Sequence, residues 1–291
     1  MRRVEDASSS DLKTACTEAV SPRSSCRRLV TLLPLTSYLS PLALYLLPLT
    51  SCGTLPPLRG KIDVGRESYA VFVGGSGMSG DLYAVRANGG PVYQITFTTV
   101  AELRPALAPN GTDLAFLRGL SLRDSTPASL WIMNLLNGAE REVELPKGAG
   151  PPSRVVWSPD GAALIVQAAN GLYRLGAPPA RPNAQPVPAA ERASAESTLS
   201  VLLGDPVFAR VVPCKRAEDL CVIPRSGRSG ILAQAASDPV RWGTDSVAFF
   251  AGELLQIRPL ARGRPRLLHW SDAPARPRQV TFFQAALPGD T

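Results

Sequence analysis

A repeated strand-turn-strand pattern constrains the fold of this chain more than any other feature of its sequence. Each copy opens near a leucine, continues with alternating side chains, reaches a turn containing Gly or Pro, and leads into a second strand-like stretch. Alternation with period two around such turns is typical of β-hairpins. The five copies are DLYAVRANGGPVYQITF (81–97), SLWIMNLLNGAEREVEL (129–145), GLYRLGAPPARPNAQPV (171–187), DLCVIPRSGRSGILAQ (219–234) and ELLQIRPLARGRPRLL (253–268).

A second strand pair precedes each hairpin. In the clearest copies an apolar strand, a tight polar turn and another apolar strand follow one another, and Asn110-Gly111 and Asp160-Gly161 supply turn residues that tolerate positive φ. The clear copies are RPALAPNGTDLAFLRG (104–119), SRVVWSPDGAALIVQAA (153–169) and PVRWGTDSVAFFAG (239–252), and the less regular ones are IDVGRESYAVFVGG (62–75) and GDPVFARVV (204–212).

Four strands per unit, repeated along the chain, predict an all-β fold. The chain is 45% hydrophobic, and its 28 prolines and 24 glycines are spread along its length, as many short strands require. One four-stranded sheet cannot bury both faces, whereas sheets stacked around an axis can. We therefore predict a β-propeller of four-stranded blades, with five blades recognisable. A further strand at 276–284 either closes the ring or begins a sixth blade.

Several turns share a more specific motif. One reads Trp157-Ser158-Pro159-Asp160-Gly161, and shorter versions read Ala108-Pro109-Asn110-Gly111 and Trp242-Gly243-Thr244-Asp245. Gln94-Ile95-Thr96-Phe97 and Gln279-Val280-Thr281-Phe282 resemble one another as endings of a unit. Together these motifs resemble the repeat of the TolB-type β-propeller family.

The resemblance covers residues 61–284 and is more specific for fold than for function. Propellers of this type occur in binding proteins, in peptidase-associated domains and in some enzymes. TolB itself also has an N-terminal α/β domain, for which this chain has no room. The resemblance therefore implies a shared architecture and not the same component of the Tol system.

The N-terminal region predicts export and lipid anchoring. An uncharged apolar run at 29–49 follows the basic pair Arg27-Arg28 and leads into Leu49-Thr50-Ser51-Cys52. This ending resembles the lipobox of bacterial lipoproteins, which implies that Cys52 is acylated and becomes the mature N-terminus. The predicted domains are a signal region at 1–51 (polar 1–28, apolar 29–49), a lipidated tether at 52–60 and the propeller at 61–291.

An uncleaved transmembrane helix is the alternative for the apolar run, since about 20 residues span a bilayer. Pro34, Pro41 and Pro48 interrupt the run, however, and interior prolines disrupt helices. The alternative also leaves the position of Cys52, directly after two small residues, without an explanation.

The chain contains five cysteines. Cleavage removes Cys16 and Cys26, and lipidation uses Cys52, which leaves Cys214 and Cys221 in a compartment that permits disulfides. These two flank a short loop between predicted strands, where cross-strand Cβ atoms lie close enough to bridge. We predict a Cys214–Cys221 disulfide; two free buried thiols are the alternative.

The sequence contains few signals of catalysis. The Gly-x-Gly-x-x-Gly run at 75–80 joins two predicted strands and is interpreted as a hairpin loop, because a dinucleotide site needs a helix after it. His269 is the only histidine, and we interpret it as structural. Trp131, Trp157 and Trp242 are interpreted as packing residues. We predict no catalytic, cofactor or metal site, because the inner-strand segments PALA, RVVW, PVFA and PVRW are mostly apolar.

The predicted function is that of a non-catalytic interaction platform on a membrane of the bacterial envelope. The partners are the membrane, through the N-terminal lipid, and an envelope protein or glycan, bound by a loop such as 119–128 or 176–199. The net charge of +7 is too small and too dispersed to indicate nucleic acid. Gly53, in place of Asp, favours the periplasmic face of the outer membrane. A propeller enzyme, such as a lyase or lactonase acting on an envelope or carbohydrate substrate, is the alternative.

Overall fold

The computed structural model describes residues 56–75, 78–122, 128–178, 183–199, 201–202, 208–215, 219–224, 226, 228–243, 246–260, 264–272 and 274–286. Every element below belongs to the unit Gly53–Thr291. Its regular structure is almost entirely β-strand, and the helices described are a 3-10 turn, η2 (Ala189–Glu191), and α1 (Arg192–Thr198). The prediction of an all-β fold is confirmed.

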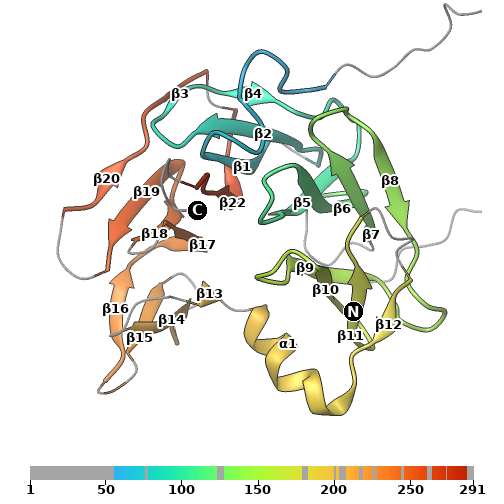
Figure 1. Ribbon diagram of the computed structural model, residues 1–291. Helices are drawn as coiled ribbons and strands as arrows, with labels where there is room; N and C mark the ends of the chain where they lie inside the picture. Colours follow the sequence, from blue (N-terminus) through green and yellow to red (C-terminus); the bar gives the residue numbers. More distant parts are fainter. Residues whose placement is uncertain are drawn as a thin grey trace, which may run out of the picture. The chain divides into compact units, whose positions relative to one another are not determined.

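The strands form five four-stranded antiparallel sheets around a common axis, so the chain is a five-bladed propeller (Figure 1). In the following list, the strand nearest the axis comes first in each blade. Blade 1 holds β22 (Arg278–Phe283), β1 (Tyr69–Gly74), β2 (Asp81–Arg86) and β4 (Tyr93–Gln94); blade 2 holds β5 (Ala101–Leu107), β6 (Asp113–Gly119), β7 (Ala128–Asn134) and β8 (Glu140–Val143); blade 3 holds β9 (Pro152–Trp157), β10 (Ala163–Ala168), β11 (Gly171–Gly176) and β12 (Gln185–Pro186); blade 4 holds β13 (Val201–Leu202), β14 (Phe208–Pro213), β15 (Leu220–Pro224) and β16 (Gly230–Ala233); blade 5 holds β17 (Ala236–Trp242), β18 (Ser246–Ala251), β19 (Leu254–Pro259) and β20 (Arg266–Leu267).

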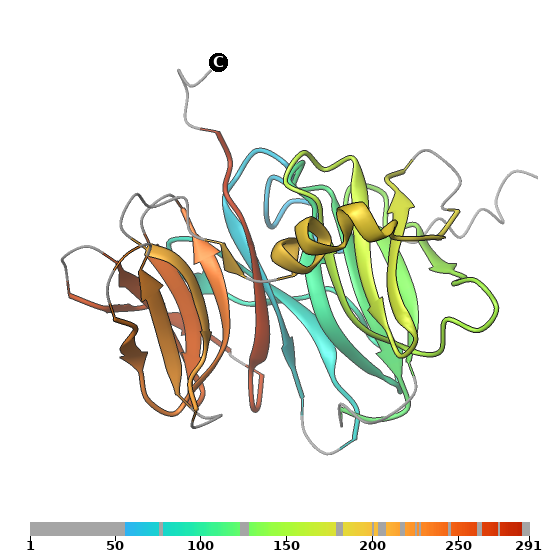
Figure 2. The ribbon, with the colours of Figure 1, turned by 90° about the horizontal axis from the view of Figure 1, so that it is seen from below.

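The C-terminal strand closes the ring. Strand β22 pairs antiparallel with β1, with Tyr69 opposite Phe283 and Val71 opposite Thr281. Figure 2 shows the two strands, dark red and blue, running side by side. A short parallel pair between β3 (Gly90–Pro91) and β21 (Trp270–Ser271) adds a second link. Of the two predicted roles for 276–284, ring closure is therefore the one observed.

Two less regular repeats differ from their prediction. Segment 62–75 was expected to hold two strands, but its first part consists of turns and only β1 is a strand. The reason is that β22 already occupies the inner edge of blade 1. In segment 204–212, the described strand is β14, which begins at Phe208, and the inner position of blade 4 belongs to β13.

Apolar side chains hold the blades together. All six residues of β1 are buried, and Phe72 of that strand lies 4.9 Å from the Trp270 ring and 6.1 Å from the Phe250 ring. Burying one such aromatic side chain contributes about 1.5–3 kcal/mol relative to exposure. These contacts join blade 1 to blade 5 across their faces, which is the burial that one blade alone cannot achieve.

The three tryptophans singled out in the sequence are packing residues, as predicted. The Trp157 indole N–H donates to the Ala106 carbonyl at 2.9 Å and joins blade 3 to blade 2. Trp242 stacks on Phe282 with ring centroids 3.8 Å apart and joins blade 5 to blade 1. Trp131 is half-buried and packs against the core, and the Arg118 guanidinium lies 4.3 Å from its ring centroid.

The predicted tight turns are present. Gly111 and Gly161 lie at φ 66° and 70°, a region that side chains with a Cβ rarely adopt. The Asn110 side chain accepts from the Thr112 N–H, and Asp160 accepts from the Ala162 N–H. These turns join the inner strand of a blade to its second strand, at the end of the channel described next.

Candidate functional site

Strands around the axis of the propeller enclose a cavity of about 730 Å³. Its walls come from β5, β9, β14, β17 and β22. Thr198, the last residue of α1, and Leu199, which follows it, also line the cavity. Pro109, Pro159 and Gln284, in the turns that follow the inner strands, also line it. We refer to this cavity as the channel.

Polar side chains enter the channel from one equivalent position in four blades. Each stands near the start of an inner strand, before the apolar segment: Arg104 in β5, Arg154 in β9, Asp238 in β17 and Gln279 in β22. The expectation of mostly apolar inner strands is wrong at this position. The segments PALA, RVVW and PVRW begin at or just after this position. Aligning the inner strands of the blades would therefore have revealed the polar residues from the sequence.

The backbone is unusual at three of these four positions. Arg104, Asp238 and Gln279 have φ values of 53°, 52° and 53°. Each lies where the strand pairing shifts register, so a β-bulge turns the chain there. Positive φ is unfavourable for a residue with a Cβ and persists only where surrounding structure enforces it; such positions cluster at functional sites.

The three residues at positive φ interact with one another. The Arg104 N–H donates to the Gln279 side-chain oxygen at 2.8 Å. The Arg104 guanidinium lies 3.8 Å from the Asp238 carboxylate, so this ion pair joins blade 2 to blade 5 in front of blade 1. Both side chains are partly buried, at 34% and 21% exposure. The bulges thus place a connected polar cluster in the channel.

Arg154 carries the least compensated charge of the cluster. Its guanidinium reaches the water of the channel, but the surrounding walls desolvate it, which lowers its pKa from the ordinary value. The nearby charge of Arg104 lowers this pKa further, and Asp238 opposes the shift. Among the lining residues that the structure describes, arginines stand at three positions, 104, 154 and 241, against one carboxylate at Asp238. The channel therefore favours an anionic group.

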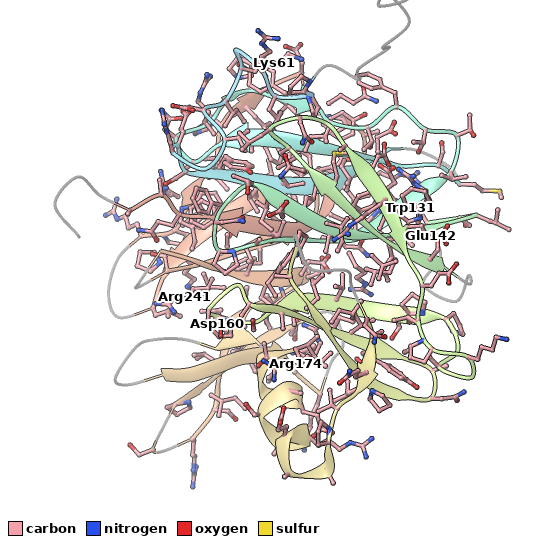
Figure 3. The ribbon with its side chains drawn as sticks, turned by 45° about the vertical axis from the view of Figure 1, so that its right-hand side comes forward. Lys61, Trp131, Glu142, Asp160, Arg174 and Arg241 are labelled. Carbon is pink, nitrogen blue, oxygen red and sulfur yellow. A yellow bond between two sulfur atoms is a disulfide. The ribbon has the colours of Figure 1, made fainter. Side chains whose placement is uncertain are left out.

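Two charged residues near the mouth of the channel are labelled in Figure 3. Arg241 lies in β17, the inner strand of blade 5, and Asp160 lies in the turn after β9, the inner strand of blade 3. The Arg241 guanidinium donates to the Gly243 carbonyl at 2.9 Å. In the turn of blade 3, the Ser158 hydroxyl donates to the Asp160 carboxylate, which also accepts from the Ala162 N–H.

The predicted disulfide is present. Cys214 follows β14 and Cys221 lies in β15, with their Cα atoms 5.1 Å apart and their sulfurs bonded. At the end of the same hairpin, the Cys214 N–H donates to the Asp219 carbonyl at 2.7 Å. This bridge ties the end of a hairpin and lies outside the channel lining.

The other predicted positions do not belong to the channel. Cys52 lies outside the described residues. The imidazole of His269 is exposed between β20 and β21, and its backbone carbonyl accepts from the Gly90 N–H. The run 75–80 joins β1 to β2, as a hairpin loop should. Over the described ranges, no helix is both long and apolar enough to cross a bilayer, and no cluster of His, Cys, Asp or Glu could hold a metal ion.

The two predicted binding loops differ in position. Segment 176–199 contains β12, η2 and α1, and its end contributes Thr198 and Leu199 to the channel wall. The described residues of segment 119–128 join β6 to β7 and do not line the channel; the Leu122 N–H donates to the Met78 carbonyl. Of the two, only the first reaches the channel.

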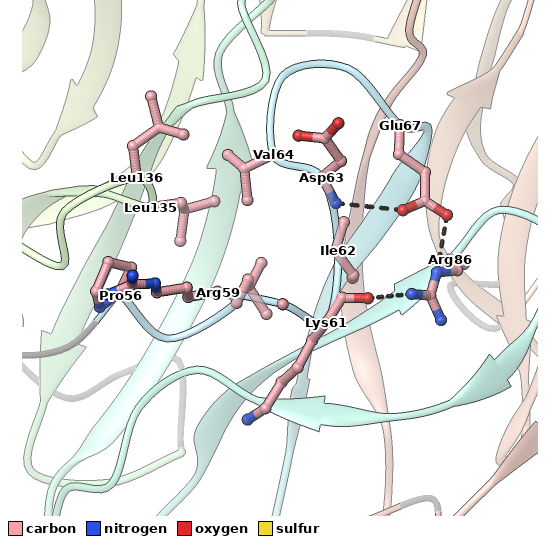
Figure 4. Close-up of a pocket in the computed structure, with 12 residues that line it drawn as sticks. Pro56, Arg59, Lys61, Ile62, Asp63, Val64, Glu67, Arg86, Leu135 and Leu136 are labelled. Carbon is pink, nitrogen blue, oxygen red and sulfur yellow. Dashed lines mark hydrogen bonds and ion pairs between the residues drawn. The ribbon is translucent and has the colours of Figure 1, made fainter.

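A second cavity, of about 620 Å³, lies beside the first described residues (Figure 4). Pro56, Ile62 and Val64 face Leu135 and Leu136, which follow β7. Two of its charged groups are paired: Arg86 binds Glu67 at 2.8 Å and also donates to the Lys61 carbonyl. It is a cleft between the N-terminal segment and blade 2, with less uncompensated charge than the channel.

Comparisons with known proteins find only low similarity. No protein-family model matches the chain, and no curated protein matches it either. Solved structures that resemble it include TolB from Acinetobacter baumannii (13% identity, TM-score 0.36, covering 74% of this chain and 66% of that one). A functionally unknown protein from Desulfotomaculum acetoxidans DSM 771 (11%, 0.34, covering 70% and 68%) and dipeptidyl peptidase 4 from Porphyromonas gingivalis (12%, 0.32, covering 65% and 36%) are also similar. At these values, no function passes from those proteins to this chain.

Proposed function

We propose that the chain is a non-catalytic lipoprotein of the bacterial cell envelope whose propeller binds a protein or a glycan at the channel. The cavity of about 730 Å³ at the axis carries this proposal. Its size falls within the range of about 300–1,000 Å³ that is usual for ligand sites. Apolar walls surround a few converging polar groups, which is the usual construction of a recognition site.

The chemistry of the lining supports binding over turnover. Among the described residues that line the channel, Asp238 is the single carboxylate, and neither His nor Cys is present. General acid–base catalysis commonly uses a His or a pair of carboxylates, and a nucleophile needs an adjacent base. Three arginines, Gln279 and Thr281 bind and orient a ligand without supplying such a pair.

The sequence supports the location. Leu49-Thr50-Ser51-Cys52 resembles a lipobox, and two or three acyl chains hold a protein firmly on a membrane. Gly53 in place of Asp favours the outer membrane, with the propeller on its periplasmic side. In this proposal the lipid binds the membrane and the channel binds the partner.

A propeller enzyme, such as a lyase or lactonase acting on an envelope or carbohydrate substrate, is the second candidate. The observation that favours it is the position of Asp238 beside Arg104, at 3.8 Å, inside the largest described cavity. A carboxylate next to a cation is one way to build a base beside an anion-stabilising group. For an enzyme of this type, Asp238→Asn abolishes turnover of a substrate that the variant still binds.

The proposal is tested by partner capture from envelope membranes with the purified protein. We expect the wild-type protein and His269→Ala to capture the same partner, and a variant carrying both Arg104→Gln and Arg154→Gln to lose it. Circular dichroism should show the same β-sheet content for all three proteins. Capture that survives the double substitution contradicts a channel site, and a turnover that depends on Asp238 contradicts a non-catalytic role.

A further inference from the structure

The strongest unassigned feature of the molecule is the arginine pair of the channel. Arg104 and Arg154 occupy the equivalent position of the inner strands in blades 2 and 3, which are neighbours in the ring. Both line the same cavity. Their charges are close enough to interact, because the charge of Arg104, after desolvation, is a cause of the lowered pKa of Arg154. Two like charges held together in this way require an anion for balance.

The carboxylate of the lining is already engaged with the other arginine. Asp238 lies 3.8 Å from Arg104 in an ion pair, and it is the only acidic residue among the described residues of the lining. Over the described part of the chain, no hydrogen bond or ion pair joins Arg154 to a carboxylate. One guanidinium therefore remains open toward the cavity, and its planar fork matches the two oxygens of a carboxylate or a phosphate.

The apolar walls of the channel favour a carboxylate over a phosphate. Val155 and Val280 are buried in the wall, and Val156, Val240 and Pro239 line the same space. A phosphate needs many donors to replace its hydration, whereas a carboxylate carries a single charge and is commonly attached to apolar atoms. A carboxylate on an apolar chain therefore fits a cavity lined by valines and prolines better than a phosphate does.

The cluster is also preorganised. Arg104 sits at φ 53°, where the bulge and the hydrogen bond from its N–H to Gln279 hold the backbone. A side chain whose backbone is held in this way spends less conformational entropy on binding than one on a free loop. The residues at positive φ in blades 1, 2 and 5 thereby place their polar groups close to one another in the channel.

Building on the proposed binding function, we infer that Arg154 and Arg104 form a carboxylate-binding site, and that its ligand is a carboxylate on an apolar peptide segment of the partner protein. The carboxylate is either the C-terminus of that segment or an acidic side chain within it. The guanidinium of Arg154 binds the carboxylate oxygens, and the valines contact the neighbouring aliphatic side chains.

The test is calorimetric titration of the purified full-length protein at low salt with three peptides. They are acetyl-alanyl-valyl-valine with a free carboxylate, the same peptide as its C-terminal amide, and acetyl-valyl-glutamyl-valine amide. We expect saturable binding of at least one acidic peptide and none of the uncharged amide. A C-terminal ligand is indicated by binding of the first peptide, and an acidic side chain by binding of the third.

Substitution of one arginine inside the channel and one outside it tests whether the peptide binds at Arg154. We expect Arg154→Gln to weaken binding of the acidic peptide at least about tenfold, the loss typical of a charge-assisted hydrogen bond. Arg266→Gln removes the same charge from the exposed outer strand β20, outside the channel lining, and should bind as the wild type does. Circular dichroism of both variants reports whether they are folded.

Three results overturn the inference: no saturable binding of either acidic peptide to the folded protein, equal weakening by Arg266→Gln, or binding of inorganic phosphate without binding of acidic peptides. The titration needs neither membrane nor partner. A failed titration with intact partner capture therefore refutes only the carboxylate site, and a successful titration without any capture refutes the proposed platform.

Discussion

Glu102 is a carboxylate that water does not reach, with 0% exposure. One of its oxygens accepts from Arg118 at 2.7 Å and the other accepts from the Thr96 hydroxyl. Burial raises the pKa of Glu102 from its ordinary value, and the hydrogen bonds from Thr96 and Arg118 oppose that rise. Arg118 also binds Glu140 at 2.8 Å and stacks on Trp131, so blade 2 holds one continuous polar network.

We predict that Arg118→Met destabilises the protein by about 3–5 kcal/mol, because it leaves a buried carboxylate without its partner. Adding Glu102→Gln to that variant removes the charge and should recover part of the loss. Urea unfolding followed by circular dichroism measures both. As a control, Arg174→Met breaks an exposed pair with Glu191, and such pairs contribute about 0–1 kcal/mol. A double variant no more stable than Arg118→Met contradicts the argument.

At the scale of the elements, β22 has two structural roles. It is the inner strand of blade 1, and two of its side chains, Gln279 and Thr281, accept hydrogen bonds from the backbone of β5 in blade 2. Without it, β1 presents an unpaired edge, and unpaired edges promote aggregation. Ring closure and the polar cluster of the channel therefore depend on the same C-terminal strand.

Removal of residues 277–291 is predicted to abolish cooperative unfolding and to produce aggregation, since it deletes β22. Removal of 287–291 alone leaves every described residue in place, so we expect its free energy of unfolding to lie within about 0.5 kcal/mol of the wild type. Thermal denaturation and size-exclusion chromatography distinguish the two truncations. A monomeric 1–276 fragment with a sharp transition means that the ring does not need its closing strand.

At the scale of the whole molecule, the proposed lipid anchor depends on Cys52 alone. We predict that Cys52→Ala abolishes incorporation of a palmitate label and leaves the precursor uncleaved, because the thiol is the acylated group. Cys214→Ala, which removes a cysteine of the disulfide, should retain the label. Gel analysis of labelled membranes measures both. Label in the Cys52→Ala protein is incompatible with the lipoprotein proposal.

The sequence by itself determined the architecture, because each repeat specifies its own hairpin. Period-two alternation from 81 to 268, and turns such as Asp160-Gly161, depend on local backbone preferences that act within a few residues. The Cys214–Cys221 bridge was predictable for the same reason, since both cysteines flank one hairpin. The lipobox proposed at Cys52 likewise rests on a local motif, Leu49-Thr50-Ser51-Cys52.

Only the tertiary structure decided which residues meet at the axis. Arg104 and Gln279 are 175 positions apart in sequence, and their contact exists because β22 returns to blade 1 and bulges re-aim one residue in each inner strand. A one-residue bulge reverses which side chains face the channel, and alternation alone does not predict where it falls. The first of the two strands expected within 62–75 is absent for a related reason, because β22, from the far end of the chain, occupies the place beside β1.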